Sequence, residues 1–593
     1  MNKKLAQGLL FLLTGLAAMP AHAQTQHIII VVQENRTPDN LFAGNLTLQG
    51  EHAEVSTSAQ CNGSSTTLKA YASLDACFNP NHDHGPAPIP GVSPGGGFEG
   101  AWDPANSSWD NGCLVPAMYA SCYVGSAVAP NYTYINDYPA FPTIILPYNQ
   151  IAEQYGFSNW MFQTNQGPSY LAHQFLFSGT SAPINYPTTY SDYFAAENPT
   201  GNSTHSGGCG APSGTTVTDL WSGFTATLLQ FWPTEYTYYT PSLPSGSPAG
   251  FPCYDHHSMA DLLDAGSVSW KYYIQDNTAN YANSIWTAPN SLSGICLPLS
   301  SGVCDGSEYT SHVVNTTGQI LNDINNPCGG TCNASTCILP EVSWVIPDGA
   351  WSDHPGDVGS DGGPSWVAAI VNAIGAQSKG YSGSPSDCGY WGKDNNTTIL
   401  IVWDDWGGWY DHVAPYLSAT RGTKGGYPSP PSAGPTNGQW YVYGFRVPLL
   451  VVSAFVNATD TTGGYISGTT SQGGEVPPYV HDFGSILGFI EHTYSLPPNT
   501  SGLNTCGIGY LANSTCDFPY ADYFAPDGLY ECGLTSNNCN ETAAYPLEDF
   551  FFSGSPRTFT TITGAKYPSS CFTSASNASH CFGSNFPSDA DDE

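Results

Sequence analysis

The sequence predicts an α/β fold in which a mostly parallel central sheet is flanked by helices. Strand-like runs of β-branched and aliphatic residues lack strict alternation, which is typical of strands covered on both faces. Helical patterns lie between these runs, and strands that alternate with helices indicate a parallel sheet. Long stretches rich in Gly, Ser, Pro, Asn and Thr interrupt the pattern, and the 18 cysteines suggest that disulfides hold these loop insertions.

The expected elements follow in chain order. Strands are predicted at residues 27–32, 268–274, 342–346, 398–402 and 447–452. Helices are predicted at 147–155, from Ser169 as far as Gly179, from a Ser365 cap through 374, and at 481–494. The insertions span about 45–140, 181–250, 276–340 and 377–396. They exceed ordinary connections in length, so we interpret them as excursions around the rim of a site and not as linkers between domains.

The N-terminus has the pattern of a secretory signal peptide, residues 1–23. Two lysines precede an apolar stretch that is short for a membrane span, and Ala21-His22-Ala23 fits a cleavage site. The alternative is an uncleaved anchor. No later run is apolar for long enough to cross a bilayer, so we expect a secreted or periplasmic protein without a stable membrane anchor. Residues 24–565 are expected to form one domain, followed by a Cys-containing acidic tail at 566–593.

The charge balance narrows the choice of partners. The chain has 47 acidic residues against 12 Lys and Arg, a formal net charge of −35. This excess argues strongly against nucleic acid as a partner and disfavours a basic membrane-docking face. A pI near 4.3 fits acidic surroundings, where self-repulsion falls, although a secreted enzyme with an acidic coat at neutral pH has the same composition. Composition does not predict the oligomeric state.

The cysteines indicate disulfides. All 18 lie beyond the signal segment, and an even count in an exported chain favours up to nine bridges of unknown pairing. The run "CGGTCNASTC", with Cys328, Cys332 and Cys337, offers metal thiolates as an alternative. We prefer disulfides there because no second CxxC-like pair or nearby His accompanies the run.

Polar residues follow two of the predicted strands directly. Glu34 and Asn35 come after strand 27–32, and Asp404 and Asp405 come after strand 398–402 and Trp403. If these strands are parallel neighbours, the four side chains emerge at the same sheet edge, where ligands bind in open α/β sheets. Crowded carboxylates repel one another unless a cation lies among them, so the pattern predicts one divalent metal ion. Oxygen ligands favour Mg²⁺, Ca²⁺ or Mn²⁺, and nearby imidazoles keep Zn²⁺ or iron open. The alternative is that each pair lies in a solvated loop.

Ser169 is the candidate nucleophile, and several histidines are candidates for anion binding. Ser169 follows Gly-Pro and begins an apolar helical run, so its hydroxyl is expected where the helix dipole favours an anion; a plain N-cap is the alternative. The loop histidines that lie next to acidic residues are His82, His84, His256, His257 and His354, the last beside Asp353. Such imidazoles bind a phosphate or protonate a leaving oxygen, and a zinc site is the alternative. His173 and His492 are interpreted as structural, and His412 is expected near the site.

The sequence resembles a known family in several blocks. The run "VVQENRTPDNLF" is similar to the Glu-Asn-Arg-Ser-Phe-Asp-x-x-Phe signature of the bacterial phospholipase C and acid phosphatase (phosphoesterase) family. Further blocks resemble that family in order: "SWVIPDGAWSDHP", "IVWDDWGGWYDHV", "YGFRVPLLVVSAFV", "HDFGSILGFIE" and "DFFFSGSPRTF". The resemblance spans about residues 27 to 562. Thr37-Pro38 replaces the family's usual Ser-Phe, and Asn40 stands where the family often has His.

The resemblance implies an alkaline-phosphatase-like core and hydrolysis of phosphate esters. It implies metal ligands at Glu34, Asn35, Asp404 and Asp405 and a nucleophile at Ser169. It matches His256, His257 and His354 to histidines that bind phosphate or assist the leaving group, and His82 less closely; His84 and Asp353 lie beside them and are expected to contact the phosphate. The chain ends near the usual end of the catalytic domain, which favours the shorter, phosphatase-like branch.

We therefore expect an exported, metal-dependent phosphoesterase that works through a phosphoserine. The first alternative is a phospholipase C that releases diacylglycerol and a phosphorylated head group. Loop aromatics offer a cage for a choline-type cation, although we interpret them as loop packing: Trp102, Trp109, Tyr119, Tyr123, Tyr132 and Tyr134. The second alternative is a non-catalytic secreted binding protein on the same scaffold.

Overall fold

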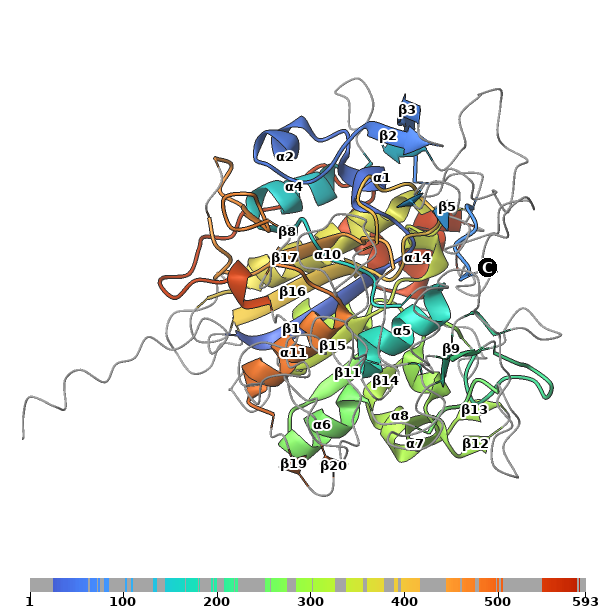
Figure 1. The fold of residues 1–593 in the computed structure, drawn as a ribbon. Helices are drawn as coiled ribbons and strands as arrows, with labels where there is room; N and C mark the ends of the chain where they lie inside the picture. Colours follow the sequence, from blue (N-terminus) through green and yellow to red (C-terminus); the bar gives the residue numbers. More distant parts are fainter. Residues whose placement is uncertain are drawn as a thin grey trace, which may run out of the picture.

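The fold is a large twisted sheet with helices on both faces, seen in the computed structural model of Figure 1. Apart from short internal gaps, this structure describes residues 25–84, 132–181, 207–217, 251–325, 338–377, 389–415, 444–496 and 547–586, with a few short strands between them. The predicted signal segment, Cys328, Cys332 and Cys337 lie outside the described residues, as do His256 and His257.

The central sheet has eight strands in the order β14-β11-β15-β1-β16-β17-β8-β18. Their bounds in this order are Val313–Val314, Trp270–Tyr273, Val342–Val345, Thr25–Gln33, Asn396–Trp403, Leu449–Val452, Gly156–Ser158 and Tyr465–Ser467. The pairs on both sides of β1 and out to β14 are parallel, whereas β17 runs antiparallel to β16 and β8. The mostly parallel α/β sheet is therefore confirmed, and each of the five predicted strands is one of its members.

The register between β1 and β16 decides where the polar pairs emerge. The two strands are parallel neighbours, with Val32 opposite Val402 and Gln33 opposite Trp403. Every residue of β16 is buried, as expected for a strand covered on both faces. The chain therefore leaves both strands at the same edge, with Glu34-Asn35 beside Asp404-Asp405.

Helices cover the two faces in two groups (Figure 1). On one side α10 (Gly363–Ala376) packs against α4 (Leu146–Gln154) and α9 (Gln319–Asn325), and on the other α11 (Phe483–Tyr494) packs against α5 (Ser169–Ser178). The end of α5 is as predicted, because Gly179 takes the left-handed conformation, with φ 69°. The start of α10 differs from the prediction. The helix begins at Gly363, and Ser365 is no cap, because its hydroxyl accepts a hydrogen bond from the backbone N–H of Tyr567 at 3.1 Å.

Smaller elements surround this core. The short helices are α1 (Pro38–Phe42), α2 (Leu46–Gly50), α6 (Met259–Gly266), α7 (Ser293–Cys296), α8 (Ser307–His312) and α14 (Ala575–Phe582). The short strand pairs are β2 (Ser58–Cys61) with β3 (Ser64–Thr67), β4 (Lys69–Tyr71) with β7 (Thr133–Ile135), β5 (Trp102–Asp103) with β6 (Ser108–Trp109), β9 (Tyr193–Ala195) with β10 (Asp219–Trp221), β12 (Leu299–Ser300) with β13 (Val303–Cys304), and β19 (Asn499–Thr500) with β20 (Leu503–Asn504). Most of them lie within the predicted insertions.

Disulfides hold several of these peripheral segments. In the described part of the chain, bridges join Cys209 to Cys253, Cys296 to Cys304 and Cys571 to Cys581. The last bridge lies in the predicted acidic tail. There Phe572, Phe582 and Phe586 pack around the ring of Trp351, with centroids 5.4–5.5 Å apart, so the start of this tail is fastened to the core.

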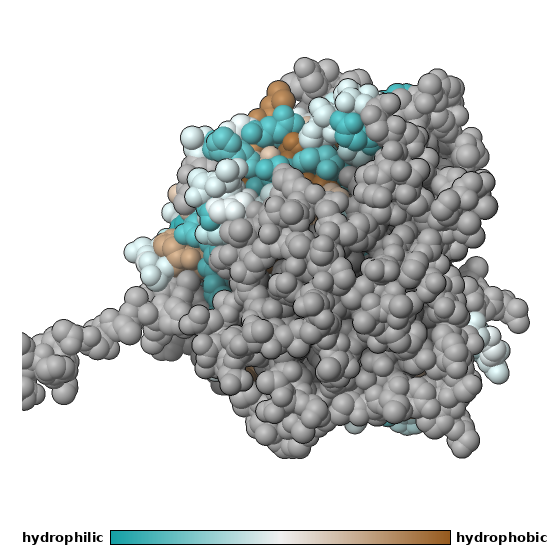
Figure 2. Space-filling model, viewed as in Figure 1, coloured by the Kyte–Doolittle hydropathy of each residue, from teal (hydrophilic) through white to brown (hydrophobic). Residues whose placement is uncertain are grey.

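The described part of one face is mainly polar. In Figure 2 the described atoms on one face, over α2 and α4, are mostly teal and white with small scattered brown areas. Among the described helices none combines the length and apolarity that a membrane crossing requires.

Candidate active site

Ser169 meets the two polar pairs beyond the sheet edge. It is the first residue of α5, and its hydroxyl Oγ lies 3.3 Å from Glu34 Oε2, 3.2 Å from Asn35 Oδ1 and 3.1 Å from Asp405 Oδ2. All of these side chains are fully buried. The N-cap position belongs to Pro168, so Ser169 does not act as a plain cap. One hydroxyl hydrogen satisfies one acceptor at a time, so three acceptors around one hydroxyl make an oxygen-rich site.

The two loops that carry these polar pairs pack against each other tightly. Asn35 adopts a left-handed backbone conformation, with φ 56°, which Asn tolerates better than most residues. Gly407 is also left-handed, and a Cβ added there would lie 2.3 Å from the carbonyl oxygen of Asn35. The backbone N–H of Asn35 donates to Asp404 Oδ1 at 3.0 Å, and that of Gly407 donates to Asp405 Oδ1 at 2.6 Å. The glycine after the second pair is therefore required for the close approach of the loops.

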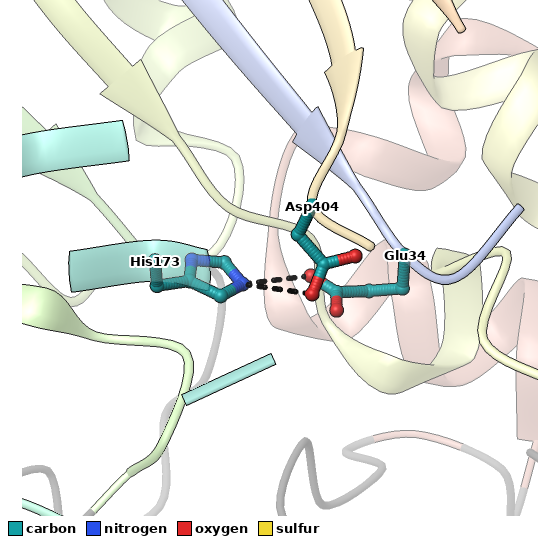
Figure 3. Close-up of side chains that lie close together, drawn as sticks. All are labelled: Glu34, His173 and Asp404. Carbon is teal, nitrogen blue, oxygen red and sulfur yellow. Dashed lines mark hydrogen bonds and ion pairs between the residues drawn. The ribbon is translucent and has the colours of Figure 1, made fainter. Parts of the chain in front are cut away.

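His173 joins the same group of side chains (Figure 3). Its Nε2 lies 3.0 Å from Glu34 Oε1 and 3.8 Å from Asp404 Oδ2. Interpreting His173 as structural therefore missed its place in the site. A signal was present in the sequence, because His173 stands four residues after Ser169, and residues i and i+4 share one face of a helix. The helix that carries the hydroxyl also carries the imidazole.

The donor set fits a hard divalent cation. Glu34, Asp404 and Asp405 are three carboxylates without exposed surface, and burying several like charges together is unfavourable unless a cation compensates. Among the described residues, Asp404 Oδ2 is buried without a hydrogen-bond partner. Single ligand atoms of Glu34, His173 and Asp404 lie within 4.8 Å of one another. Carboxylate oxygens with an imidazole suit Mn²⁺, Fe²⁺ or Zn²⁺, and the oxygens alone suit Mg²⁺ or Ca²⁺.

Two of the predicted loop histidines lie beside this group. His82 Nδ1 is 2.9 Å from the carbonyl oxygen of Pro80, so this nitrogen donates, and Nε2 accepts from Asn35 Nδ2 at 3.1 Å in the neutral imidazole. The ring of His354 lies 6.0 Å from that of His82. His84 is buried, and its backbone N–H donates to Glu197 Oε2. The structure brings His82 and His354 to the site; it does not describe His256 and His257.

Asp353 has contacts different from those expected of a phosphate ligand. Its Oδ2 accepts hydrogen bonds from the Tyr148 hydroxyl at 2.8 Å and from Trp403 Nε1 at 3.1 Å. Burial raises the pKa of Asp353 from 3.8 to about 7, against the lowering effect of Arg36 and these donors. A carboxylate held by core aromatics supports the loop and repels a phosphate when charged, so we do not retain Asp353 as a phosphate ligand.

Side chains at and just after the end of β1 form hydrogen bonds with the backbone that precedes His354. Gln33 Nε2 donates to the carbonyl oxygen of Trp351 at 3.2 Å, and its Oε1 accepts from the N–H of Asp353 at 2.9 Å. Arg36 donates to the carbonyl oxygen of Asp353 through Nε at 2.8 Å and Nη2 at 2.6 Å. These bonds fix the His354 loop to the strand that carries Glu34 and Asn35.

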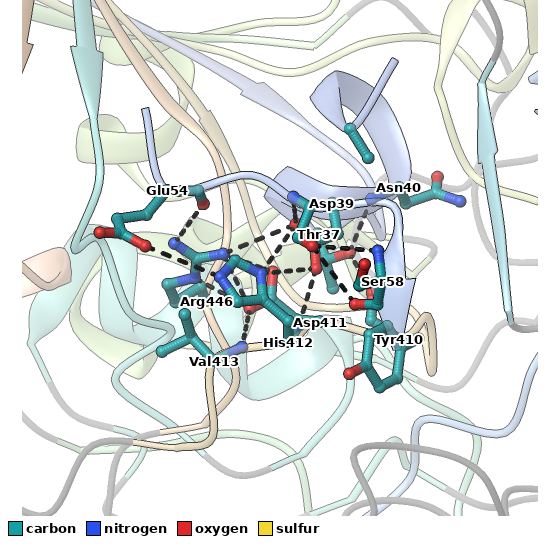
Figure 4. A network of polar contacts seen from close by, with 12 residues as sticks. Thr37, Asp39, Asn40, Glu54, Ser58, Tyr410, Asp411, His412, Val413 and Arg446 are labelled. Carbon is teal, nitrogen blue, oxygen red and sulfur yellow. Dashed lines mark hydrogen bonds and ion pairs between the residues drawn. The ribbon is translucent and has the colours of Figure 1, made fainter. Parts of the chain in front are cut away.

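His412 belongs to a neighbouring ion-pair network and not to the group of Glu34, His173 and Asp404 (Figure 4). Its Nδ1 lies 2.8 Å from Asp39 Oδ2, and Arg446 donates to both oxygens of Asp411 at 2.9 and 3.0 Å. Burial lowers the pKa of His412, but Asp39 and Glu54 outweigh it and raise the pKa to about 9. Two cations thus face two buried carboxylates, and the network ties α1 to the loop after β16.

Comparisons with known proteins show the family of this chain. A model of the Phosphoesterase family matches residues 25–497, and the chain belongs to that family. It is similar to the non-hemolytic phospholipase C of Pseudomonas aeruginosa, 26% identical over 188 residues, which are 30% of this chain and 23% of that protein. It is also similar to phospholipase C B of Mycobacterium tuberculosis, 32% identical over 207 residues, 34% of each chain, and to the non-hemolytic phospholipase C of Burkholderia pseudomallei, 26% identical over 306 residues, 47% of this chain and 37% of that one. The matches thus cover between 23% and 37% of the length of these relatives.

Proposed function

We propose that this protein hydrolyses phosphoric esters with Ser169 as the nucleophile. The observation that supports this most is the position of the Ser169 hydroxyl at the start of α5, 3.1–3.3 Å from oxygens of Glu34, Asn35 and Asp405. Family membership supports the reaction class, and an alkaline-phosphatase-like core is part of the proposal. The ligands of one divalent ion would be Glu34, Asn35, Asp404 and Asp405, with His173 beside them. When bound, such an ion supplies Lewis acidity to the phosphate and lowers the pKa of a nearby hydroxyl.

The residues of the chain supply the remaining chemistry. Ser169 Oγ attacks phosphorus while its hydroxyl proton passes to a neighbouring acceptor, of which Asp405 Oδ2 is nearest at 3.1 Å. The ester P–O bond breaks and a phosphoserine forms. His354, or one of His256 and His257, protonates the departing alcohol oxygen, and general acid catalysis of this kind contributes roughly 10²–10⁴-fold. Water then hydrolyses the phosphoserine, and the same histidine takes its proton.

Two substrate classes fit this reaction. An acid-phosphatase-like monoesterase agrees with the acidic composition, whereas similarity to phospholipases C favours phospholipid cleavage. Tyr132 is buried and stacks on Tyr410 at 4.6 Å, which fits loop packing and gives no support to a choline cage. Trp102, Trp109, Tyr119 and Tyr123 have side chains outside the described residues. Export through the N-terminal signal segment completes the proposal.

Product analysis tests the proposal. The protein is assayed with p-nitrophenyl phosphate and with phosphatidylcholine micelles between about pH 4 and pH 7. Release of nitrophenol with intact lipid assigns a monoesterase, and release of phosphocholine and diacylglycerol assigns a phospholipase C. A folded Ser169→Ala variant is expected to lose turnover on either substrate. Metal-loaded protein that is inactive on both would favour the non-catalytic alternative.

A further inference from the structure

Trp286 is a buried aromatic residue of the 276–340 insertion that the proposed mechanism does not use. Its side chain is 1% exposed. The indole lies nearly parallel to the imidazole of His173, at 16° with centroids 6.4 Å apart, and 6.1 Å from the ring of His354. It therefore lies near both the imidazole beside the proposed metal ligands and the imidazole proposed as the acid.

The indole N–H of Trp286 is buried without a hydrogen-bond partner among the described residues. Buried donors are almost always paired, so an unpaired one needs an explanation. The N–H groups of Trp351, Trp366 and Trp406 are also unpaired there. Trp351 packs among phenylalanines of the tail, and Trp406 stacks on Phe445. Trp286 differs from these because its ring contacts two histidines of the site.

Contacts on both sides of Trp286 fix its place relative to α5. The Tyr272 hydroxyl donates to the carbonyl oxygen of Trp286 at 2.9 Å. A few residues further on, the Tyr170 hydroxyl donates to Ser291 Oγ at 2.9 Å, and Tyr170 stands directly after Ser169 in α5. These two hydrogen bonds fix the segment that carries the indole relative to the helix that carries the proposed nucleophile.

The two buried arginines near the site are already engaged by the protein, so a bound phosphate would need other hydrogen-bond donors. Arg36 donates to the carbonyl oxygens of Asp353 and Leu74, and Arg446 is paired with Asp411. Both buried guanidinium groups thus donate to groups of the protein. A phosphate oxygen only accepts hydrogen bonds, and an indole N–H only donates, so the two are complementary.

We propose that Trp286 is a substrate-binding residue whose indole N–H donates to a non-bridging oxygen of the substrate's phosphate group. This inference rests on the proposed phosphoesterase function and adds a donor to it. The same contact would hold inorganic phosphate as a product. A hydrogen bond to a charged acceptor corresponds to an affinity change of roughly 10- to 100-fold.

The test removes the indole N–H and keeps a smaller aromatic ring at the same position. Trp286→Phe removes the N–H and retains an aromatic side chain, and Trp366→Phe makes the same change inside α10, where the indole is likewise fully buried and unpaired. Binding of inorganic phosphate to the metal-loaded proteins is measured by calorimetry, together with KM for p-nitrophenyl phosphate, metal content and the thermal midpoint. Trp286→Phe is expected to weaken phosphate binding and raise KM about 10- to 100-fold with metal content unchanged, and Trp366→Phe is expected to change neither.

Three results would overturn the assignment of Trp286. Phosphate affinity equal to that of the unmodified protein would show that the N–H does not contact the anion. Equal losses in both variants would show a general packing effect. Loss of bound metal in Trp286→Phe alone would show that the indole acts through His173. Calorimetry needs no turnover, so a protein that binds phosphate through Trp286 but hydrolyses neither substrate would contradict the proposed function and leave this inference standing.

Discussion

Replacing Gln33 with Met should separate the positioning of His354 from the stability of the fold. Met has a similar length but no side-chain amide. The change therefore removes two hydrogen bonds: the one that Gln33 donates to the Trp351 carbonyl oxygen at 3.2 Å, and the one that it accepts from the Asp353 N–H at 2.9 Å. Two buried backbone groups lose their partners, at about 1–3 kcal/mol each, so the loop is weakened by roughly 2–6 kcal/mol. Arg36 still holds the carbonyl of Asp353, so the loop should shift without unfolding.

The consequence should depend on the leaving group. An alkyl alcohol such as glycerol needs a proton as it departs, whereas nitrophenolate leaves readily without one. If His354 is the acid, Gln33→Met should reduce kcat/KM for glycerol phosphate at least about 10-fold more than for p-nitrophenyl phosphate, a part of the ~10²–10⁴-fold that acid catalysis supplies.

Asn372 provides a matched control for Gln33. Its amide forms the same kind of pair with backbone, donating to the carbonyl of Ile562 at 2.8 Å and accepting from its N–H at 2.9 Å, on α10. Asn372→Leu should lower the thermal midpoint without changing the ratio of the two substrates. Equal loss on both substrates in Gln33→Met would refute the positioning of an acid by this residue.

Three further predictions concern the metal, the pH dependence and the tail. Asp405→Asn should lower bound metal in elemental analysis and reduce turnover by at least about 10-fold; full occupancy would remove Asp405 from the ligand set. The pKa of Asp353 is raised from 3.8 to about 7. Protonated Asp353 therefore adds roughly 4 kcal/mol to the free energy of unfolding; this contribution is fully present below pH 3.8 and is lost as pH rises through about 7. Urea unfolding should show this decline, and Asp353→Asn should flatten it; an unchanged slope would contradict the pKa assignment. Replacing Cys571 and Cys581 with Ser opens a bridge of sequence separation 10 and should cost about 2–4 kcal/mol in thermal unfolding, and an unchanged midpoint would show that packing alone holds the tail.

The sequence was informative where local pattern determines structure. The aliphatic runs of β1 and β16 are so apolar that strands buried on both faces were the natural prediction, and the polar pairs after them met as expected. The predicted cap at Ser365 was wrong because the helix already begins two residues earlier, at Gly363, and Pro364 is well suited to the first turn of a helix. Local pattern cannot show which partner a side chain finds across the fold.

Long-range contacts account for the residues that sequence reasoning missed. Asp353 stands beside His354 in the chain, yet its carboxylate bonds to Tyr148, about two hundred positions earlier. Trp286 lies in an insertion whose sequence gives no sign that it packs beside His173. His173 itself was accessible through its four-residue spacing from Ser169, a helical relation that needs no tertiary information.

The most direct test of the proposed phosphoserine mechanism is a search for phosphate on Ser169 during turnover. The metal-loaded protein is mixed with p-nitrophenyl phosphate, quenched with acid within the first turnovers and digested, and the peptide carrying Ser169 is sequenced by mass spectrometry. This mechanism predicts phosphate on Ser169, absent from a Ser169→Ala control. Rapid turnover with an unmodified Ser169, or with phosphate on another residue, would contradict it.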